Sequence, residues 1–231
     1  MMVNSNMKKW VPKPVKRVVR NLVQKHQLSS AIGAMAHLPN GETPSRQLLT
    51  DLIAGWDNPG FAADLDYVEE LAGRASTTAG PILECGTGLT TIILGLLAGR
   101  RGVEVWSLEN SEEWHHRISG TLKHHGIKGV RISFAPLRDY QEFCWYDPPL
   151  LEMPNQFSLV VCDGPPGTTK GGRYGLMPIL GNRLAAGSVV LLDDAERPGE
   201  IESLNRWKSE ARLDIRIVEK SSGTFAVITH L

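Results

Sequence analysis

Residues 82–91 read Ile82-Leu83-Glu84-Cys85-Gly86-Thr87-Gly88-Leu89-Thr90-Thr91, an apolar run that ends in two closely spaced glycines. Glycine at such a point lets the backbone turn tightly, and it lets a ligand approach main-chain atoms that a Cβ would shield. The stretch therefore predicts a buried strand, a tight turn and the start of a helix, with a ligand held at the turn. Two acidic residues strengthen this interpretation, because Glu84 precedes the first glycine by two positions and Glu109 ends the next apolar run.

From residue 81 onward, short apolar runs alternate with helix-length amphipathic segments, which is typical of βαβ units in a parallel sheet. The expected strands cover residues 81–85, 103–109, 130–135, 157–163 and 188–193, and the expected helices lie near 90–98, 112–125, 174–185 and 200–210. The last apolar runs, 215–220 and 224–230, are joined by Ser221-Ser222-Gly223, which suits an antiparallel hairpin. We expect an α/β fold of Rossmann-like type, with a mostly parallel seven-stranded sheet, a C-terminal antiparallel hairpin and helices on both faces.

The N-terminal 41 residues differ from the rest in charge. They hold seven Lys or Arg and no Asp or Glu, although 25 basic and 25 acidic residues balance over the whole chain. Residues 8–28 combine these basic residues with apolar residues at helical spacing, namely Val11, Val15, Val18, Val19, Leu22 and Val23. This pattern predicts an amphipathic helix that docks on its own domain or on a partner subunit, as in a homodimer. A membrane surface or a nucleic acid is the alternative.

We therefore divide the chain into a basic N-terminal extension, residues 1–41, and a ligand-binding domain, residues 42–231. Two further helices are expected at the start of this domain, at 45–56 and 61–75.

Bulk properties narrow the class of protein. The balanced charge gives no general attraction to nucleic acid, and three cysteines do not form a paired disulfide framework. Cys85 and Cys162 lie in apolar runs, where buried free thiols are expected. No apolar stretch approaches the roughly 20 residues that span a bilayer, so we expect no transmembrane segment and a soluble, cytoplasmic protein.

Glu84 distinguishes two kinds of nucleoside ligand, whereas Glu109 suits both. A carboxylate at the end of the second strand can accept hydrogen bonds from ribose hydroxyls in a dinucleotide or in an adenosyl ligand. A carboxylate beside the turn would repel a pyrophosphate, whereas it would suit a cationic ligand with an ammonium group. Thr91 also occupies the position of the third glycine in the dinucleotide pattern. An NAD-dependent oxidoreductase is therefore the weaker alternative, and a binding protein without catalytic activity is a third.

These residues resemble the first two motifs of class I S-adenosylmethionine-dependent methyltransferases, and the resemblance extends from residue 81 to the C-terminus. It implies S-adenosylmethionine as the cofactor, with Glu84, Gly86 and Gly88 along its methionine portion and Glu109 at its ribose. We expect Asn110 and Leu137 at the rim of the adenine, because they follow the second and third expected strands.

Asp163 is the first candidate for catalysis. It ends the buried run 157–163 and enters a Gly- and Pro-rich loop, and ligands of open α/β sheets gather at such strand ends. Methyl transfer needs alignment of the acceptor and removal of a proton, so we expect Asp163 to orient or deprotonate the acceptor. Lys170, Tyr174 and Asp194 are further candidates. The loop lacks the Gly-Lys-Ser/Thr ending of a phosphate-binding loop, which excludes that class of nucleotide hydrolase.

Asp163, Asp193 and Asp194 could also bind a divalent cation through oxygen ligands. The arrangement is similar to that of catechol-type O-methyltransferases, whose magnesium is held by an Asp after the fourth strand and by an Asp-Asn pair after the fifth. Asp163 and Asp194 match the two aspartates, but Ala195 stands in the position of the Asn.

The acceptor is expected to be a small molecule with a hydroxyl or amine group, and no specific nucleic-acid partner is predicted. Loops 140–156 and 164–173 and the N-terminal helices would shape its pocket, and the paired glycines of the second loop would let it move as a lid. Arg173 could pair with an anionic acceptor, and capping a helix or solvation at the surface are equal alternatives. The pairs His115-His116 and His124-His125 lack the spacing for shared metal ligation and are expected on the surface.

Overall fold

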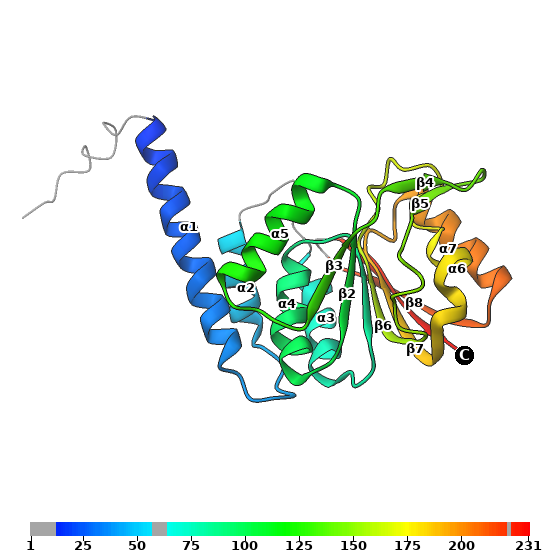
Figure 1. The fold of residues 1–231 in the computed structure, drawn as a ribbon, viewed down its shortest axis with the longest axis horizontal. Helices are drawn as coiled ribbons and strands as arrows, with labels where there is room; N and C mark the ends of the chain where they lie inside the picture. The colour runs from blue at the N-terminus through cyan, green and yellow to red at the C-terminus, as the bar shows by residue number, and fades with distance from the viewer. Residues whose placement is uncertain (1–12, 57–63, 221–222) are drawn as a thin grey trace, which may run out of the picture.

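The computed structural model describes residues 13–56, 64–220 and 223–231 of the chain. Seven strands form one sheet in the order β3-β2-β1-β6-β7-β9-β8 (Figure 1). They are β1 (Ile82–Cys85), β2 (Val105–Glu109), β3 (Val130–Phe134), β6 (Phe157–Cys162), β7 (Leu184–Leu192), β8 (Leu213–Glu219) and β9 (Thr224–His230). Neighbouring strands are parallel except for β9, which pairs antiparallel with both β7 and β8. The predicted fold class is confirmed.

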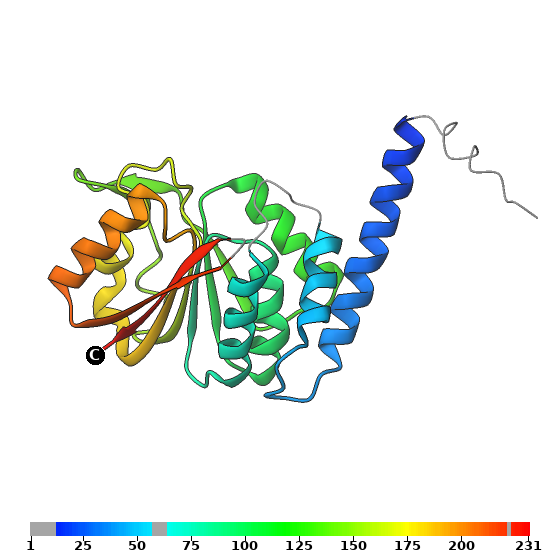
Figure 2. The same cartoon turned by 180° about the vertical axis from the view of Figure 1, so that it is seen from behind.

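Helices cover both faces of this sheet (Figures 1 and 2). They are α1 (Lys13–Ala36), α2 (Arg46–Trp56), α3 (Leu65–Thr77), α4 (Leu89–Leu97), α5 (Glu112–His124), α6 (Leu176–Leu180) and α7 (Pro198–Glu210), with short 3-10 helices at Gly99–Arg101 and Gly181–Arg183. Successive side chains of a strand point to opposite faces of the sheet, so each strand contributes residues to two hydrophobic cores. In β6, Leu159 and Val161 join the core under α3, α4 and α5, whereas Val160 and Cys162 join the core under α6 and α7.

The second half of α1 belongs to the first core. Ala31, Ile32 and Met35 are buried in it, and α1 packs along α2. The first half projects beyond the body of the protein, on the side where the sheet strands end (Figure 1). Residues 8–12 of the expected helix lie outside the described residues, as do residues 61–63 of the helix that the structure places at α3, and the linker residues 221–222.

Two segments differ from the sequence-based expectation. The helix expected at 174–185 is α6 followed by a 3-10 turn, and β7 begins at Leu184 because this residue pairs with Phe157 at the start of β6. The loop expected at 140–156 starts within an antiparallel hairpin formed by β4 (Leu137–Asp139) and β5 (Cys144–Tyr146). Among the described residues, no helix is both long and apolar enough to cross a membrane.

Candidate functional site

The glycine turn after β1 packs directly against the loop after β6. The amide nitrogens of Asp163 and Gly164 lie 3.1 and 2.7 Å from the carbonyl oxygen of Cys85. Gly86 has a φ of +87°, and a Cβ on it would lie 3.1 Å from the nitrogen of Gly164, so both its conformation and its surroundings favour glycine. Because β1 lies between β2 and β6 in the sheet, the turn lies between the ends of these two strands.

Glu84 supports the turn from beneath. Its carboxylate is buried and accepts hydrogen bonds from the hydroxyls of Thr90 at 2.6 Å, Thr91 at 2.8 Å and Ser107 at 2.6 Å. The Thr91 hydroxyl also accepts a hydrogen bond from the amide of Gly88 at 2.9 Å, which ties the carboxylate to the second glycine. Burial raises the pKa of Glu84 to about 7, although the three hydroxyls favour the ionised form.

Glu84→Gln is expected to remove a pH-dependent cost of folding. Glu84 titrates near its ordinary value of 4.5 when unfolded and at about 7 when folded, so stability falls as pH rises through this window. Urea denaturation at pH 5 and pH 8 should show the variant gaining about 2–3 kcal/mol on the wild type over that range. The exposed Glu113→Gln is the control, and an equal pH dependence in Glu84→Gln and the wild type would contradict the assignment.

Glu109 is nearly fully buried at the end of β2. Its Oε2 accepts hydrogen bonds from the amide of Thr87 at 3.0 Å and from the hydroxyl of the same residue at 2.6 Å, while its Oε1 accepts one from the amide of Ser111 at 2.8 Å. A carboxylate oxygen can accept two hydrogen bonds, so Oε1, which accepts one, keeps capacity for a ligand. The carboxylate thus lies against the glycine turn.

The two residues expected at the rim of the adenine follow the carboxyl ends of neighbouring strands. Asn110 is half-buried immediately after Glu109, and Leu137 is exposed in β4. The amide of Ala135 donates to the main-chain oxygen of Glu109 at 2.8 Å, which holds the ends of β2 and β3 together. Asn110 and Leu137 therefore flank one strand-end surface.

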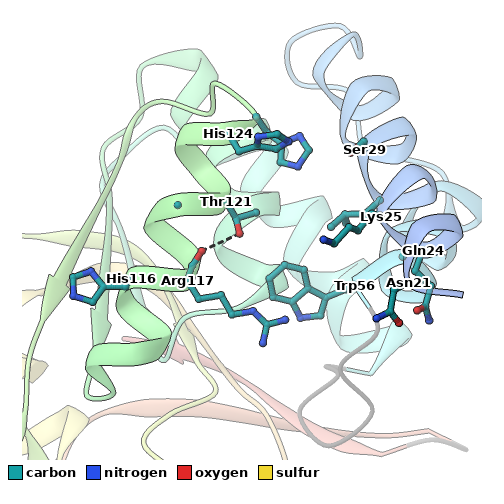
Figure 3. Close-up of a pocket in the computed structure, with 13 residues that line it drawn as sticks. Asn21, Gln24, Lys25, Ser29, Trp56, His116, Arg117, Thr121 and His124 are labelled. Carbon is teal, nitrogen blue, oxygen red and sulfur yellow. Dashed lines mark hydrogen bonds between the residues drawn. The ribbon is translucent and has the colours of Figure 1, made fainter. Parts of the chain in front are cut away.

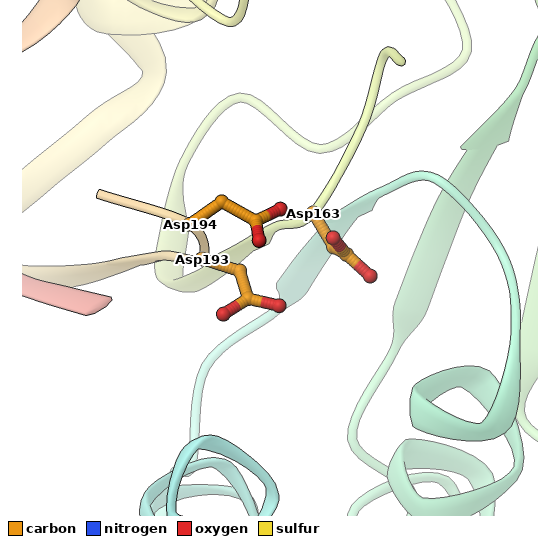
Figure 4. Close-up of side chains that lie close together, drawn as sticks. All are labelled: Asp163, Asp193 and Asp194. Carbon is orange, nitrogen blue, oxygen red and sulfur yellow. The ribbon is translucent and has the colours of Figure 1, made fainter. Parts of the chain in front are cut away.

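Asp163, Asp193 and Asp194 converge at the ends of β6 and β7, where one oxygen from each lies within 4.8 Å of the others (Figure 4). Burial raises the pKa of Asp193 to about 8, and the neighbouring Asp163 and Asp194 carboxylates add to the rise. Asp194 has a φ of +53°, a left-handed conformation that Asp tolerates better than most residues.

Arg173 lies inside this carboxylate cluster. It is 1% exposed, and its Nη2 donates to Oδ1 of Asp163 at 3.1 Å and to Oδ2 of Asp194 at 3.0 Å. The same guanidinium donates to the main-chain oxygens of Asp163 and Asp193, and the amide of Arg173 donates to the buried Glu200 at 3.1 Å. Burial opposes the charge of Arg173, but the surrounding carboxylates raise its pKa above the ordinary value. Arg173 is therefore a buried structural cation, and it is neither solvated at the surface nor exposed to an anionic acceptor, two of the roles that the sequence left open.

A divalent cation does not fit this set of donors. Asp163 and Asp194 match the metal-binding aspartates of the catechol-type O-methyltransferases, and Arg173 bridges these two carboxylates. A guanidinium nitrogen of Arg197 also lies 2.8 Å from Asp194. Two guanidinium groups thus already balance much of the carboxylate charge, and a metal ion beside Arg173 would meet a like charge at short range.

Lys170 and Tyr174 direct their polar ends away from Asp163. The Lys170 amine donates to the main-chain oxygen of Gln141 and lies 3.8 Å from Asp139, both next to the β4–β5 hairpin. The Tyr174 hydroxyl donates to Glu210 of α7 at 2.8 Å. The structure therefore brings Asp163, Asp193, Asp194 and the glycine turn together, and it holds these two side chains apart from them.

Sequence reasoning missed Tyr146, whose side chain is fully buried. Its hydroxyl has no hydrogen-bond partner among the described residues, and it lies 2.2 Å from where a Cβ on Gly164 would be. A buried hydroxyl without a partner calls for an explanation, and this one lies beside the loop that carries Asp163. Trp145 is buried as well, so this part of the expected pocket wall is core.

The paired glycines of the loop after β6 allow close packing. Gly171 and Gly172 both have positive φ, and a Cβ on them would lie 2.7 Å from Phe143 and from Glu200, respectively. Cys85 and Cys162 are buried free thiols, as expected.

No family model matches this sequence, and no curated protein matches it. Solved structures with the same fold include an O-methyltransferase from Bacillus cereus in complex with SAH, at 15% identity and a TM-score of 0.57, covering 93% of this chain and 97% of that one. A precorrin-6y C5,15-methyltransferase from Geobacter metallireducens matches at 12% identity and a TM-score of 0.54, over 74% of this chain and 90% of that one. A methyltransferase homolog from Pyrococcus horikoshii matches at 14% identity and a TM-score of 0.52, over 73% and 67%.

These likenesses establish the fold. The chain has the Rossmann-like fold of class I methyltransferases, with the antiparallel β9 inserted between β7 and β8.

Proposed function

We propose that this protein is an S-adenosylmethionine-dependent methyltransferase that acts on a hydroxyl or amine of a small organic acceptor. One observation carries the proposal: the Gly86 turn lies between the buried Glu109 at the end of β2 and Asp163 at the end of β6. Ligands of open α/β sheets bind at such strand ends, near the point where the strand order reverses. The SAH bound to the Bacillus cereus protein of the same fold supports an adenosyl ligand here.

The residues around the turn divide the work of binding this ligand. The main chain at Gly86 and Gly88 would face its methionine portion, and the Glu109 carboxylate would accept a hydrogen bond from its ribose hydroxyls, through Oε1. Asn110 and Leu137 would contact the adenine. Glu84 would act through the turn, because its oxygens are engaged by hydroxyls and its charge lies beneath the glycines.

Bound S-adenosylmethionine supplies a methyl group already activated on a sulfonium, so the protein has to align the acceptor and remove its proton. Asp163 is suited to this because its side chain remains 35% exposed and Arg173 contacts its Oδ1, which leaves Oδ2 toward the acceptor. Burial raises the pKa of Asp163 above its ordinary value, with Arg173 opposing the rise, and this makes the carboxylate a better base.

Arg173 and Asp194 would position Asp163, and no divalent cation would be needed at the transfer step. Lys170 and Tyr174 would not reach the proton of the acceptor, because their polar ends bond to Gln141 and Glu210.

Isothermal titration with S-adenosylmethionine, SAH and NAD tests the proposal. We expect the adenosyl ligands to bind with or without magnesium, and Glu109→Gln to weaken SAH binding by about tenfold to a hundredfold, since a hydrogen bond to a charged group is lost. Glu112→Gln is the matched control, because Glu112 is 76% exposed in the helix that follows. Binding of NAD alone, or equal SAH affinities in the two variants, would overturn the proposal.

A further inference from the structure

The first half of α1 carries an apolar surface that its own domain does not cover. Val19, Leu22 and Val23 are 52%, 63% and 59% exposed, and they lie one helical turn apart, on one side of the helix. In sequence, Val15 and Val18 continue the same spacing toward the N-terminus. Single exposed apolar side chains are common on protein surfaces, whereas three of them in one patch indicate a binding surface.

The opposite side of this half-helix faces the domain. Asn21, Gln24 and Lys25 line an open groove of 630 Å³ between α1, α2 and α5, where Trp56 and Arg117 lie across from them (Figure 3). The groove side of the helix is therefore polar, and the apolar patch points away from the domain. Something outside the described residues has to cover this patch if it is to be buried.

The charge of the N-terminal segment indicates which kind of partner covers the apolar patch. The first 41 residues hold seven basic residues and no acidic one. A second copy of α1 would bring its own cations without an acidic partner in that segment, and a nucleic acid would satisfy the cations but not the apolar patch. An anionic lipid surface satisfies both, because acyl chains accept the apolar side chains while headgroups pair with Lys and Arg.

We infer that the first half of α1 is an interfacial helix that binds the surface of an anionic membrane. Val19, Leu22 and Val23 insert at the boundary of headgroups and acyl chains, and the basic residues upstream of the patch contact the headgroups. The first half of the helix projects beyond the body of the protein, which leaves room for a membrane against its outer side (Figure 2).

Co-sedimentation of the full chain with lipid vesicles tests this inference. We expect binding to vesicles of phosphatidylcholine mixed with phosphatidylglycerol, weaker binding at higher salt, and little binding to phosphatidylcholine alone. The triple variant Val19→Ser, Leu22→Ser, Val23→Ser should bind the mixed vesicles about a hundredfold more weakly, at about fivefold for each of the three apolar side chains.

The matched control replaces three exposed apolar residues elsewhere, Leu150→Ser, Ile201→Ser and Ile217→Ser, and should bind as the wild type does. Circular dichroism and SAH titration confirm that each variant is folded, and SAH binding is independent of the vesicle result. The inference fails if the wild type does not bind mixed vesicles, or if both triple variants bind equally. It also fails if sedimentation velocity shows a dimer that the α1 variant dissociates.

Discussion

Arg173→Met should lower the free energy of unfolding by about 3–5 kcal/mol in urea denaturation at neutral pH. The variant keeps an apolar side chain of similar length but removes the buried cation that bridges Asp163 and Asp194. Breaking a buried ion pair by removing one partner is strongly destabilising, because it leaves an uncompensated charge in a medium that solvates it poorly. Arg138→Met is the control, since Arg138 pairs with Asp147 at the surface and should contribute less than about 1 kcal/mol.

The same variant tests whether Arg173 takes the place of a metal ion. Without the guanidinium, three carboxylate oxygens within 4.8 Å form a donor set suited to Mg²⁺ or Mn²⁺. We therefore expect Mn²⁺ to raise the melting temperature of Arg173→Met and to leave the wild type unchanged. Stoichiometric Mn²⁺ binding by the wild type, or a stability of Arg173→Met equal to that of Arg138→Met, would show that the guanidinium does not fill this role.

The sheet could be predicted from sequence because its strands are buried on both faces and therefore read as continuous apolar runs. β1 and β6 lie within a residue of the expected positions, and the hairpin at β8 and β9 is antiparallel as predicted. The alternation of strand and helix fixes a parallel arrangement, since parallel neighbours need a crossover between them.

The segments that were not predicted depend on contacts distant in sequence. Residues 174–185 have helical character, yet Leu184 forms a strand because Phe157 offers it a pairing partner. The β4–β5 hairpin carries the buried Trp145 and Tyr146 into the second core, where a loop was expected. The local sequence pattern of a segment gives no information about such partners, which come from distant parts of the chain.

In the candidate site, too, the features set by local sequence could be predicted, and those set by distant residues could not. The positions of Glu109 and Asp163 at strand ends follow from the apolar runs before them. The role of Arg173 does not, because Asp163, Asp194 and Glu200 lie 10, 21 and 27 residues away in sequence. Likewise, Thr91 looks like a missing glycine in sequence, whereas in the structure its hydroxyl joins Glu84 to Gly88.

Asp163→Asn is expected to lower kcat by about a hundredfold or more while SAH affinity stays within a few-fold of the wild type. The amide keeps an oxygen for Arg173 and nearly the same shape, so the cluster retains its geometry, but it cannot accept the proton that the acceptor loses. The measurement is steady-state kinetics with an acceptor found by screening small hydroxyl and amine compounds, together with SAH titration. Asp139→Asn, in the exposed β4 strand, is the control.

The pH profile separates a catalytic base from a residue that only shapes the pocket. A base must be ionised, so wild-type kcat should rise with pH as Asp163 loses its proton. Burial raises the pKa of this carboxyl, and the rise should therefore lie above the ordinary range of an aspartate. The variant should lack this limb and keep a flat, low rate. If Asp163→Asn retained the wild-type turnover and pH limb, proton removal would belong to another group, even though the cofactor assignment through Glu109 would stand.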